Sequence, residues 1–356
     1  MTPKVGIIGG GFTGAAVAVR LSRASAEPLD IVIVEPSAEL GRGVAYGTKD
    51  PDHRINGPTL THSLYPDDVE HFDRWCRANG VLADDPECLD IAGRAFVRRT
   101  AMGRYVGSEL AAHQADNPSG STISHIQDRA VNARTDGAGF TVSLADNDDL
   151  PVDLLVVTTS NAPPALLPPL QGAVAGHQSF YPDPWDSERL AQIAADARVL
   201  IVGTGLTMAD VAIVVGRDRP AAKITAISRR GLLPKSQRRV PSKDSFAEVL
   251  GRAVPAFVAR HGRPSSVCAM LRAVRSDASN NLASGGEWQA AFDDIRDAAH
   301  QLWPALSEQE QSRFLRHLAP WYETHRFRYP PQVDAKIQAM MASGQLTTRA
   351  AALVSA

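Results

Sequence analysis

Glycines in two short stretches have the spacing that lets backbone N–H groups hold a phosphate. The first stretch, Gly9-Gly10-Gly11-Phe12-Thr13-Gly14, follows an apolar run and precedes an apolar helical pattern that continues to Leu21. In this context the first glycine forms a tight turn, the second lets a pyrophosphate approach, and the third lets the helix lie close to the strand. We therefore expect a dinucleotide to contact Gly9, Gly11, Phe12, Thr13 and Gly14. The alternative is a glycine-rich turn without a ligand.

A carboxylate stands where the next strand is predicted to end. Residues 29–34 have the apolar pattern of a strand, and Glu35 follows directly. At this distance from the glycines a carboxylate can accept hydrogen bonds from a ribose of the dinucleotide. Strand, glycine turn, helix, strand and acid together predict the first βαβ unit of a Rossmann-like fold.

The second glycine stretch, Gly203-Thr204-Gly205-Leu206-Thr207-Met208, lies near the middle of the chain after another apolar run. Met208 stands where a third glycine is expected, so we expect this helix to lie further from its strand. The next predicted strand, 223–227, is followed by two arginines, whose guanidinium groups suit a 2′-phosphate. The arginines therefore favour NADP as the cofactor, although NAD is also compatible with the pattern. The alternative is that both arginines lie on a solvated loop and contact no nucleotide. The residues expected to contact the second nucleotide are Gly203, Gly205, Leu206, Thr207, Arg229 and Arg230.

The composition is typical of a globular protein. Of the 356 residues, 44% are apolar and 21% charged, which excludes extensive disorder. The net charge of −2 provides no basic field for nucleic acid, and the cysteines, Cys76, Cys88 and Cys268, lack the spacing of a zinc site or a disulfide framework. No stretch approaches the length of a membrane span, and no signal-peptide pattern opens the chain. We expect a cytoplasmic protein with a small-molecule substrate, whose oligomeric state stays open.

The elements that position the glycines are predicted to form an α/β fold of two Rossmann-like three-layer dinucleotide-binding units, with a β-hairpin insertion and a helical C-terminal region. Helices are expected at 67–79 and 102–112. Strands are expected at 121–132, 140–144 and 153–158, of which the first two are joined as a hairpin.

The remaining chain is divided by a proline-rich run at 162–169, which is expected to be a linker because proline removes backbone donors and fixes φ. Helical patterns dominate 242–343, and a last strand is expected within 345–354. The expected domains are 1–162, 163–240 and 241–356, the last being mostly helical with a final strand that returns to the second nucleotide unit.

A glycine-punctuated stretch, Gly41–Thr48, is predicted to be a loop, neither helix nor strand. Such a loop can wrap a ligand. Arg42 can pair with a pyrophosphate, and Tyr46 is expected to contact the same cofactor. The alternative is a plain surface loop.

With both glycine stretches and this loop, the chain resembles the FAD-NAD(P)-binding proteins related to class B flavin monooxygenases. The segments that carry the resemblance also include 180–185, 228–234 and 325–328. The resemblance implies FAD in domain 1–162, held by Gly9, Gly11, Gly14 and Glu35. It also implies NAD(P)H in the second unit, at Gly203, Gly205 and Thr207.

Three features depart from that group. Ser160 occupies a position where a glycine is expected after the strand at 153–158. The group also has a monooxygenase fingerprint in which a glycine is followed at a fixed spacing by a histidine, and the stretch from Gly172 to His177 is one residue too long for it. Proteins of the group continue beyond the last strand and return to the FAD domain, whereas this sequence ends at Ala356. We therefore expect a chain shortened at its C-terminus, or a fragment, with an incomplete flavin site.

The side chains expected near the junction of the two units are Arg42, Tyr46, Asn56, His62, Ser160, His177 and Tyr181. His62 can move protons during flavin reoxidation, because imidazole titrates near neutral pH, and the alternative is a solvated loop histidine. His177 is expected to pin the linker rather than to act in catalysis. The cationic segment His325–Arg328 either holds an anionic group or complements the dipole of a helix end.

The leading hypothesis from the sequence is an FAD-dependent NAD(P)H oxidoreductase, with hydroxylating monooxygenases among the reactions that the resemblance implies. The alternative is a catalytically decayed nucleotide-binding or partner protein without a complete flavin site. A third reading is a reductase or dehydrogenase that uses NADP alone.

Overall fold

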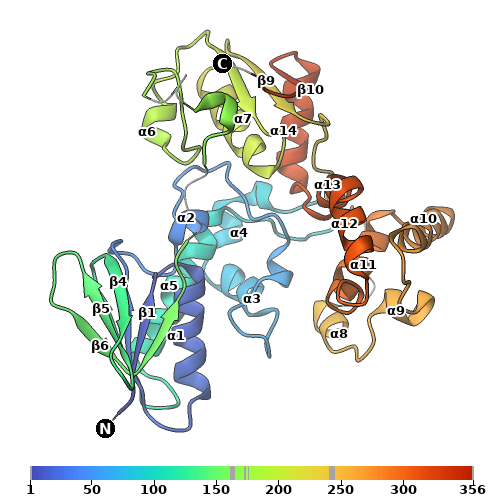
Figure 1. Cartoon of the computed structure of the whole chain (residues 1–356). Coiled ribbons are helices and arrows are strands. Elements are labelled where there is room, and N and C mark those ends of the chain that lie inside the picture. Colours follow the sequence, from blue (N-terminus) through green and yellow to red (C-terminus); the bar gives the residue numbers. More distant parts are fainter. Residues whose placement is uncertain (1, 161–164, 172–173, 175, 240–244, 355–356) are drawn as a thin grey trace. The chain divides into compact units, whose positions relative to one another are not determined.

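The computed structural model describes residues 2–160, 165–171, 174, 176–239 and 245–354 (Figure 1). The chain divides into two compact units. Unit 1 comprises Met1–His53, Ser63–Asp84 and Val97–Pro164; unit 2 comprises Arg54–His62, Asp85–Phe96 and Ala165–Ala356. Of the positions used in the sequence predictions, 162–164 of the linker, Gly172 and Ser242 lie outside the described residues.

Unit 1 is built on a parallel sheet with the strand order β3-β2-β1-β7. Its strands are β1 (Lys4–Ile8), β2 (Asp30–Val34), β3 (Thr122–Ile126) and β7 (Leu154–Val157). The alternating residues Ile7, Ile31 and Ile33 are fully buried, as expected for central strands that are covered on both faces.

Helices cover one face of this sheet, and a second sheet covers the other (Figure 1). The helices are α1 (Phe12–Ala24) and α5 (Arg99–Ala115); the second sheet is antiparallel, with β4 (Ala130–Thr135), β5 (Phe140–Leu144) and β6 (Leu150–Val152). Apolar side chains of β2 pack against those of β5 and β6 in one core cluster. The predicted three-layer unit with a hairpin insertion is therefore confirmed for unit 1.

Two local predictions in unit 1 were wrong. The strand expected at 121–132 is two strands, because the Asp128 carboxylate accepts backbone N–H groups from Arg129 and Asp146 and so stabilises a turn between them. The stretch Gly41–Thr48, expected to be a loop, contains the helical turn α2 (Gly43–Tyr46), in which the N–H of Gly47 donates to the carbonyl of Gly43 at 3.0 Å. The remaining helices of unit 1 are α3 (His71–Ala78) and α4 (Val81–Asp84).

Unit 2 contains a parallel sheet with the order β10-β9-β8. A βαβ unit of β8 (Arg198–Val202), α7 (Leu206–Asp218) and β9 (Lys223–Ser228) is joined by β10 (Leu346–Ala350), the strand expected near the end of the sequence. Buried side chains of α7, of the strands and of α14 (Pro331–Ala342) form the core of this part.

From Phe246 to α14 the described chain is mostly helical, as expected. The described elements there are α8 (Phe246–Leu250), α9 (Ala256–His261), α10 (Val267–Ala283), α11 (Gln289–Leu302), α12 (Glu308–His317) and α13 (Ala319–Arg326). They enclose a separate apolar core around Phe257 and Leu302. Serine side chains at Ser266 and Ser307 accept backbone N–H groups and fix the starts of α10 and α12.

Two short segments from early in the sequence also belong to unit 2. They carry the 3-10 turns η1 (Thr59–Thr61) and η2 (Pro86–Cys88); α6 (Ser187–Leu190) and η3 (Pro168–Leu170) complete the described elements. A buried ion pair, in which Nη1 of Arg54 lies 2.7 Å from Asp85, joins the two segments. Among the helices that the structure describes, none combines the length and the apolar character needed to cross a bilayer.

Candidate nucleotide-binding sites

The first glycine turn, between β1 and α1, is held by close backbone contacts. Gly9 has a φ of +102°, and a Cβ on Gly14 would lie 1.9 Å from the carbonyl oxygen of Gly9. Only glycine fits both positions. The Thr158 hydroxyl donates to the same carbonyl oxygen at 2.8 Å, so a side chain at the end of β7 fixes the turn.

Glu35 lies at the end of β2, beside this turn. One carboxylate oxygen accepts the backbone N–H of Gly10 at 2.8 Å, and the other accepts that of Ser37 at 3.0 Å. The carboxylate is therefore held in place by the backbone around it. Each oxygen retains a second lone pair that can accept a hydroxyl.

The stretch that follows Glu35 packs onto the glycine turn. The N–H of Gly41 donates to the carbonyl of Gly10 at 2.7 Å, and a Cβ on Gly11 would lie 3.3 Å from the Cα of Gly43. The rings of Phe12 and Tyr46 meet edge to face at 5.9 Å. Burial raises the pKa of Tyr46, and the nearby charge of Arg99 opposes that shift.

Arg42 belongs to the same neighbourhood, and its guanidinium pairs with Glu39 at 2.8 Å. The structure thus brings together the side chains and glycines predicted from the sequence for the first site. They are Gly9, Gly11, Phe12, Thr13, Gly14, Glu35, Arg42 and Tyr46. Thr158 belongs with them and was not predicted, because the pattern of β7 gives no sign that the side chain just after this strand reaches β1.

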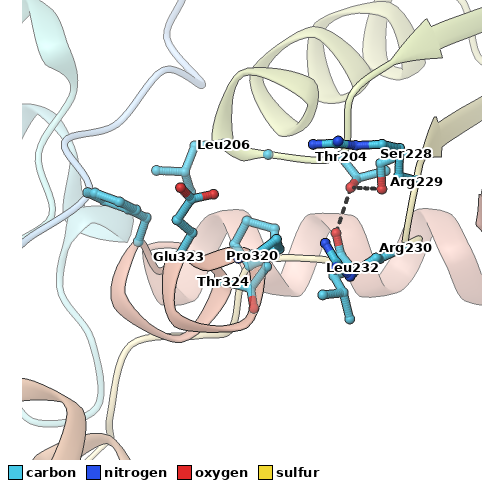
Figure 2. Close-up of a pocket in the computed structure, with 12 residues that line it drawn as sticks. Thr204, Leu206, Ser228, Arg229, Arg230, Leu232, Pro320, Glu323 and Thr324 are labelled. Atoms are coloured by element: carbon cyan, nitrogen blue, oxygen red, sulfur yellow. Dashed lines mark hydrogen bonds between the residues drawn. The ribbon is translucent and has the colours of Figure 1, made fainter. Parts of the chain in front are cut away.

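The second glycine turn, between β8 and α7, opens into a cavity of about 380 Å³ (Figure 2). Three parts of unit 2 line this pocket: the turn itself, the segment after β9, and α13 with the residue that follows it. The lining residues are Thr204, Gly205, Leu206, Ser228, Arg229, Arg230, Leu232, Pro234, Pro320, Glu323, Thr324 and Phe327.

Thr204 connects the turn to the segment after β9. Its buried hydroxyl lies 2.8 Å from the Ser228 hydroxyl and 2.6 Å from the carbonyl oxygen of Leu232, as Figure 2 shows. The segment so fixed carries Arg229 and Arg230, both exposed and both facing the pocket. Within the described part of the chain neither guanidinium has an ion pair.

The glycines of this turn have space around them. A Cβ on Gly205, whose φ is −84°, would meet no atom within 4 Å, and the same holds at Gly203. No side chain caps the start of α7, so its first N–H groups face the pocket. At the third position Met208 is buried in the apolar core of unit 2, where it blocks nothing.

Helix α13 supplies the wall that sequence reasoning missed. Pro320, Glu323, Thr324 and Phe327 recur at the spacing of one helix face, opposite the glycine turn and the arginines (Figure 2). These residues lie about a hundred positions beyond the glycines, and nothing in their pattern distinguishes them from the rest of the helical region. Gly203 and Thr207, predicted for this site, do not line the pocket.

The remaining predicted side chains are not among the residues that line the second pocket. Asn56 and His62 are on the segment 54–62 of unit 2, where the carbonyl of Asn56 accepts from Gln237 at 2.7 Å. His62 is partly buried and donates from Nδ1 to the carbonyl of Pro58 at 3.0 Å. Burial lowers the pKa of His62, against the opposing effect of that hydrogen bond, so its neutral form is favoured.

His177 lies on an exposed turn, where its Nδ1 accepts the backbone N–H of Ser179 at 3.1 Å. Ser160 is exposed beyond the end of β7. Tyr181 packs at the margin of the apolar core of unit 2, and the guanidinium of Arg189 lies over its ring.

Comparisons with known proteins agree with this geometry. A family model described as FAD-NAD(P)-binding matches residues 6–162. No curated protein sequence matches the chain.

Solved structures resemble nearly the whole chain at low sequence identity. The ornithine hydroxylase PvdA from Pseudomonas aeruginosa, in its reduced form, is 13% identical with a TM-score of 0.54; the match covers 96% of this chain and 70% of that one. The ornithine N-hydroxylase KtzI from Kutzneria sp. 744, with reduced FAD, NADP+ and L-ornithine, is 15% identical with a TM-score of 0.52, covering 98% and 71%.

A third structure, OTEMO in complex with FAD and NADP, is 18% identical with a TM-score of 0.42; the match covers 66% of this chain and only 40% of that protein. The match therefore spans less than half the length of OTEMO. Residues 6–162 match the FAD-NAD(P)-binding family model, and the chain as a whole has the fold seen in the ornithine hydroxylases.

Proposed function

We propose that this protein is an FAD-dependent oxidoreductase that uses NADPH, with FAD at the first glycine turn and NADPH at the second. The observation that carries the proposal is the presence of two separate Rossmann-type turns, of which the second opens into a pocket with two arginines. A single nucleotide would leave one of these turns without a role.

The first turn fits the diphosphate of FAD. Gly9 and Gly14 bring the start of α1 against the end of β1, in the geometry that exposes backbone N–H groups to a pyrophosphate. Glu35 is held beside the turn by two backbone N–H groups and can accept ribose hydroxyls through its remaining lone pairs. Arg42 and Tyr46 stand on the adjoining segment, as the sequence predicted for contacts to this cofactor.

The second pocket fits a phosphorylated dinucleotide. Its volume of about 380 Å³ lies in the range of small-molecule sites. The uncapped start of α7 can receive the diphosphate, and Arg229 and Arg230 offer guanidinium groups where a 2′-phosphate is expected. This choice of residues favours NADPH over NADH.

Gly9, Gly14 and Glu35 would hold FAD, Arg229 and Arg230 would hold NADPH, and the bound cofactors would supply the redox chemistry. The protein binds and orients the cofactors and excludes water from the site. His62 is neutral near pH 7 and is our candidate for holding or moving a proton. Hydroxylation of a small molecule is our choice among the oxidoreductase reactions, because both of the ornithine hydroxylases share the fold over nearly the whole chain.

The test begins with the absorbance spectrum of the purified protein, alone and after addition of FAD. We expect the yellow colour of oxidised flavin, and its loss on anaerobic addition of NADPH. Protein that stays colourless after FAD is added, while NADPH or 2′,5′-ADP still raises its melting temperature, would instead support the decayed nucleotide-binding alternative. Oxygen consumption with candidate amines then separates a hydroxylase from a simple reductase.

A further inference from the structure

A cluster of arginines in unit 2 surrounds the Asp293 carboxylate of α11. Arg328, just after α13, is 3% exposed, and one nitrogen of its guanidinium, Nη2, pairs with Asp293 of α11. Arg296 lies on the same helix, and its Nη1 is 3.3 Å from Asp293; Nη1 of Arg238 is 3.8 Å from the same carboxylate. We call these residues, together with Arg326, the guanidinium cluster.

The cluster carries more positive than negative charge. Its four guanidinium groups face the carboxylates of Asp293 and Asp297, and the charge of Glu287 also acts on Arg238. The Arg326 guanidinium lies over the ring of Phe327, and no carboxylate pairs with it within the described residues. Burial lowers the pKa of Arg238, Arg326 and Arg328, whereas at Arg296 burial is outweighed by the Asp297 and Asp293 carboxylates, which raise its pKa.

Arg328 also has hydrogen-bond donors without acceptors. Its Nε and Nη1 are buried and have no partner, although Nη2 is paired. The amide oxygen of Gln289, one turn before Asp293 on α11, is likewise buried without a partner. A buried ionised donor without an acceptor is costly, so chains seldom retain one unless something else supplies the acceptor.

We propose that the guanidinium cluster binds a small oxyanion, a carboxylate or phosphate group, one oxygen of which accepts from an unpartnered nitrogen of Arg328. Arg326 provides the partly exposed side of the site, next to Phe327 at the edge of the nucleotide pocket. Guanidinium groups match such oxyanions in charge and in donor geometry. A carboxylate would belong to an acidic small molecule, whereas a phosphate would be inorganic or part of a phosphorylated compound.

The test is a melting-temperature titration of the full chain, free of nucleotide, in phosphate or acetate at constant ionic strength against chloride. We expect a saturable rise of roughly 3–5 °C with the preferred anion, and direct titration calorimetry should give the same affinity. A larger response to acetate would identify a carboxylate ligand, and a larger one to phosphate a phosphate ligand. If neither phosphate nor acetate raises the melting temperature more than chloride does, the proposed site is wrong.

Variants locate the effect. Arg328→Met should weaken anion binding at least tenfold yet still fold, because Asp293 keeps Arg296. Arg326→Gln, at a less buried position, should also weaken binding and serves if Arg328→Met does not fold. The double variant Arg229→Ala/Arg230→Ala and the surface control Arg313→Met should keep the response. Loss of the response in the double variant with retention in Arg326→Gln would place the anion in the nucleotide pocket and overturn the proposal.

Discussion

The two glycine turns of this chain are built on different principles. In the first, backbone contacts leave no space: Gly14 touches the carbonyl of Gly9, and Thr158 closes the turn from the neighbouring strand. In the second, Gly205 stands in open space, and hydrogen bonds of Thr204 position the segment that carries the arginines. The first turn is therefore specified by shape, and the second by side chains around a pocket.

Substitution of a single glycine in each turn should give the largest difference between the two turns. Gly14→Ala places a Cβ 1.9 Å from the carbonyl oxygen of Gly9, so α1 must move away from β1. We expect a loss of about 3 kcal/mol in the free energy of unfolding and loss of FAD binding. Urea denaturation and the flavin absorbance of the purified variant measure the two effects.

The matched change in the second turn is Gly205→Ala. Because its φ is −84° and its surroundings are open, the variant should keep its stability to within about 1 kcal/mol. Its new methyl group lines the pocket, so NADPH affinity should fall about tenfold, or about 1.4 kcal/mol. Equal stability losses for the two variants would show that the turns do not differ as described.

The two arginines beside the second turn test whether its side chains select the nucleotide. The double variant Arg229→Ala/Arg230→Ala removes both guanidinium groups from the pocket. We expect NADPH affinity to fall by roughly 10–100-fold while NADH affinity changes little, because only NADPH carries the 2′-phosphate. Calorimetric titration of both nucleotides tests this, with Arg313→Ala as control. An equal loss of affinity for NADPH and NADH would show that the arginines support the structure of the site and do not contact the 2′-phosphate.

A smaller effect is expected from the two threonines that fix the turns. Thr158→Val and Thr204→Val each remove a hydroxyl with little change of shape, at a cost of about 1 kcal/mol of stability. Their ligand effects should differ: Thr158→Val should weaken FAD binding, and Thr204→Val should weaken NADPH binding by loosening the segment at 228–232. Melting curves measure the stability of each variant, and titrations with FAD and NADPH measure its affinities. If Thr158→Val weakened NADPH binding and Thr204→Val weakened FAD binding, the assignment of the two turns would be wrong.

Strong local patterns explain why much of the fold was predictable. The glycines, the apolar runs before them and the acid at Glu35 predicted the order of strand, turn, helix and strand in both units, and β2 and β9 lie within a residue of the strands expected at 29–34 and 223–227. The errors occurred where a side chain decided the backbone. Asp128 divides the strand expected at 121–132 by accepting backbone N–H groups, an interaction that strand propensity does not encode.

The candidate sites were predictable only where a motif lies within one βαβ unit. Arg229 and Arg230 follow directly from the end of β9, so their place at the second turn was expected. Glu323 and Thr324 reach the same pocket from α13 through the packing of the helical region, and their helical pattern alone does not say which neighbour they face. Contacts between distant segments are fixed by tertiary packing.

The smallest predicted effect concerns pH and again separates the two sites. Burial lowers the pKa of His325, one residue beyond Thr324 in the wall of the second pocket, against the opposing hydrogen bond from its Nδ1 to the Trp321 carbonyl. Because the folded-state pKa is below the unfolded value of about 6.5, the unfolded chain takes up this proton first as the pH falls. The stability that the neutral ring provides above pH 6.5 is therefore lost below it.

This histidine contributes little, because it is only partly buried and solvent screens the charge. We expect the wild type to lose about 1 °C more in melting temperature than His325→Phe between pH 7.5 and 5.5, since phenylalanine keeps the stacking on Phe292 and does not titrate. The same acidification should weaken NADPH binding slightly more than FAD binding, because α13 forms part of the second site and the first turn rests on backbone contacts. Identical pH profiles for wild type and variant would show that His325 does not cause this pH dependence.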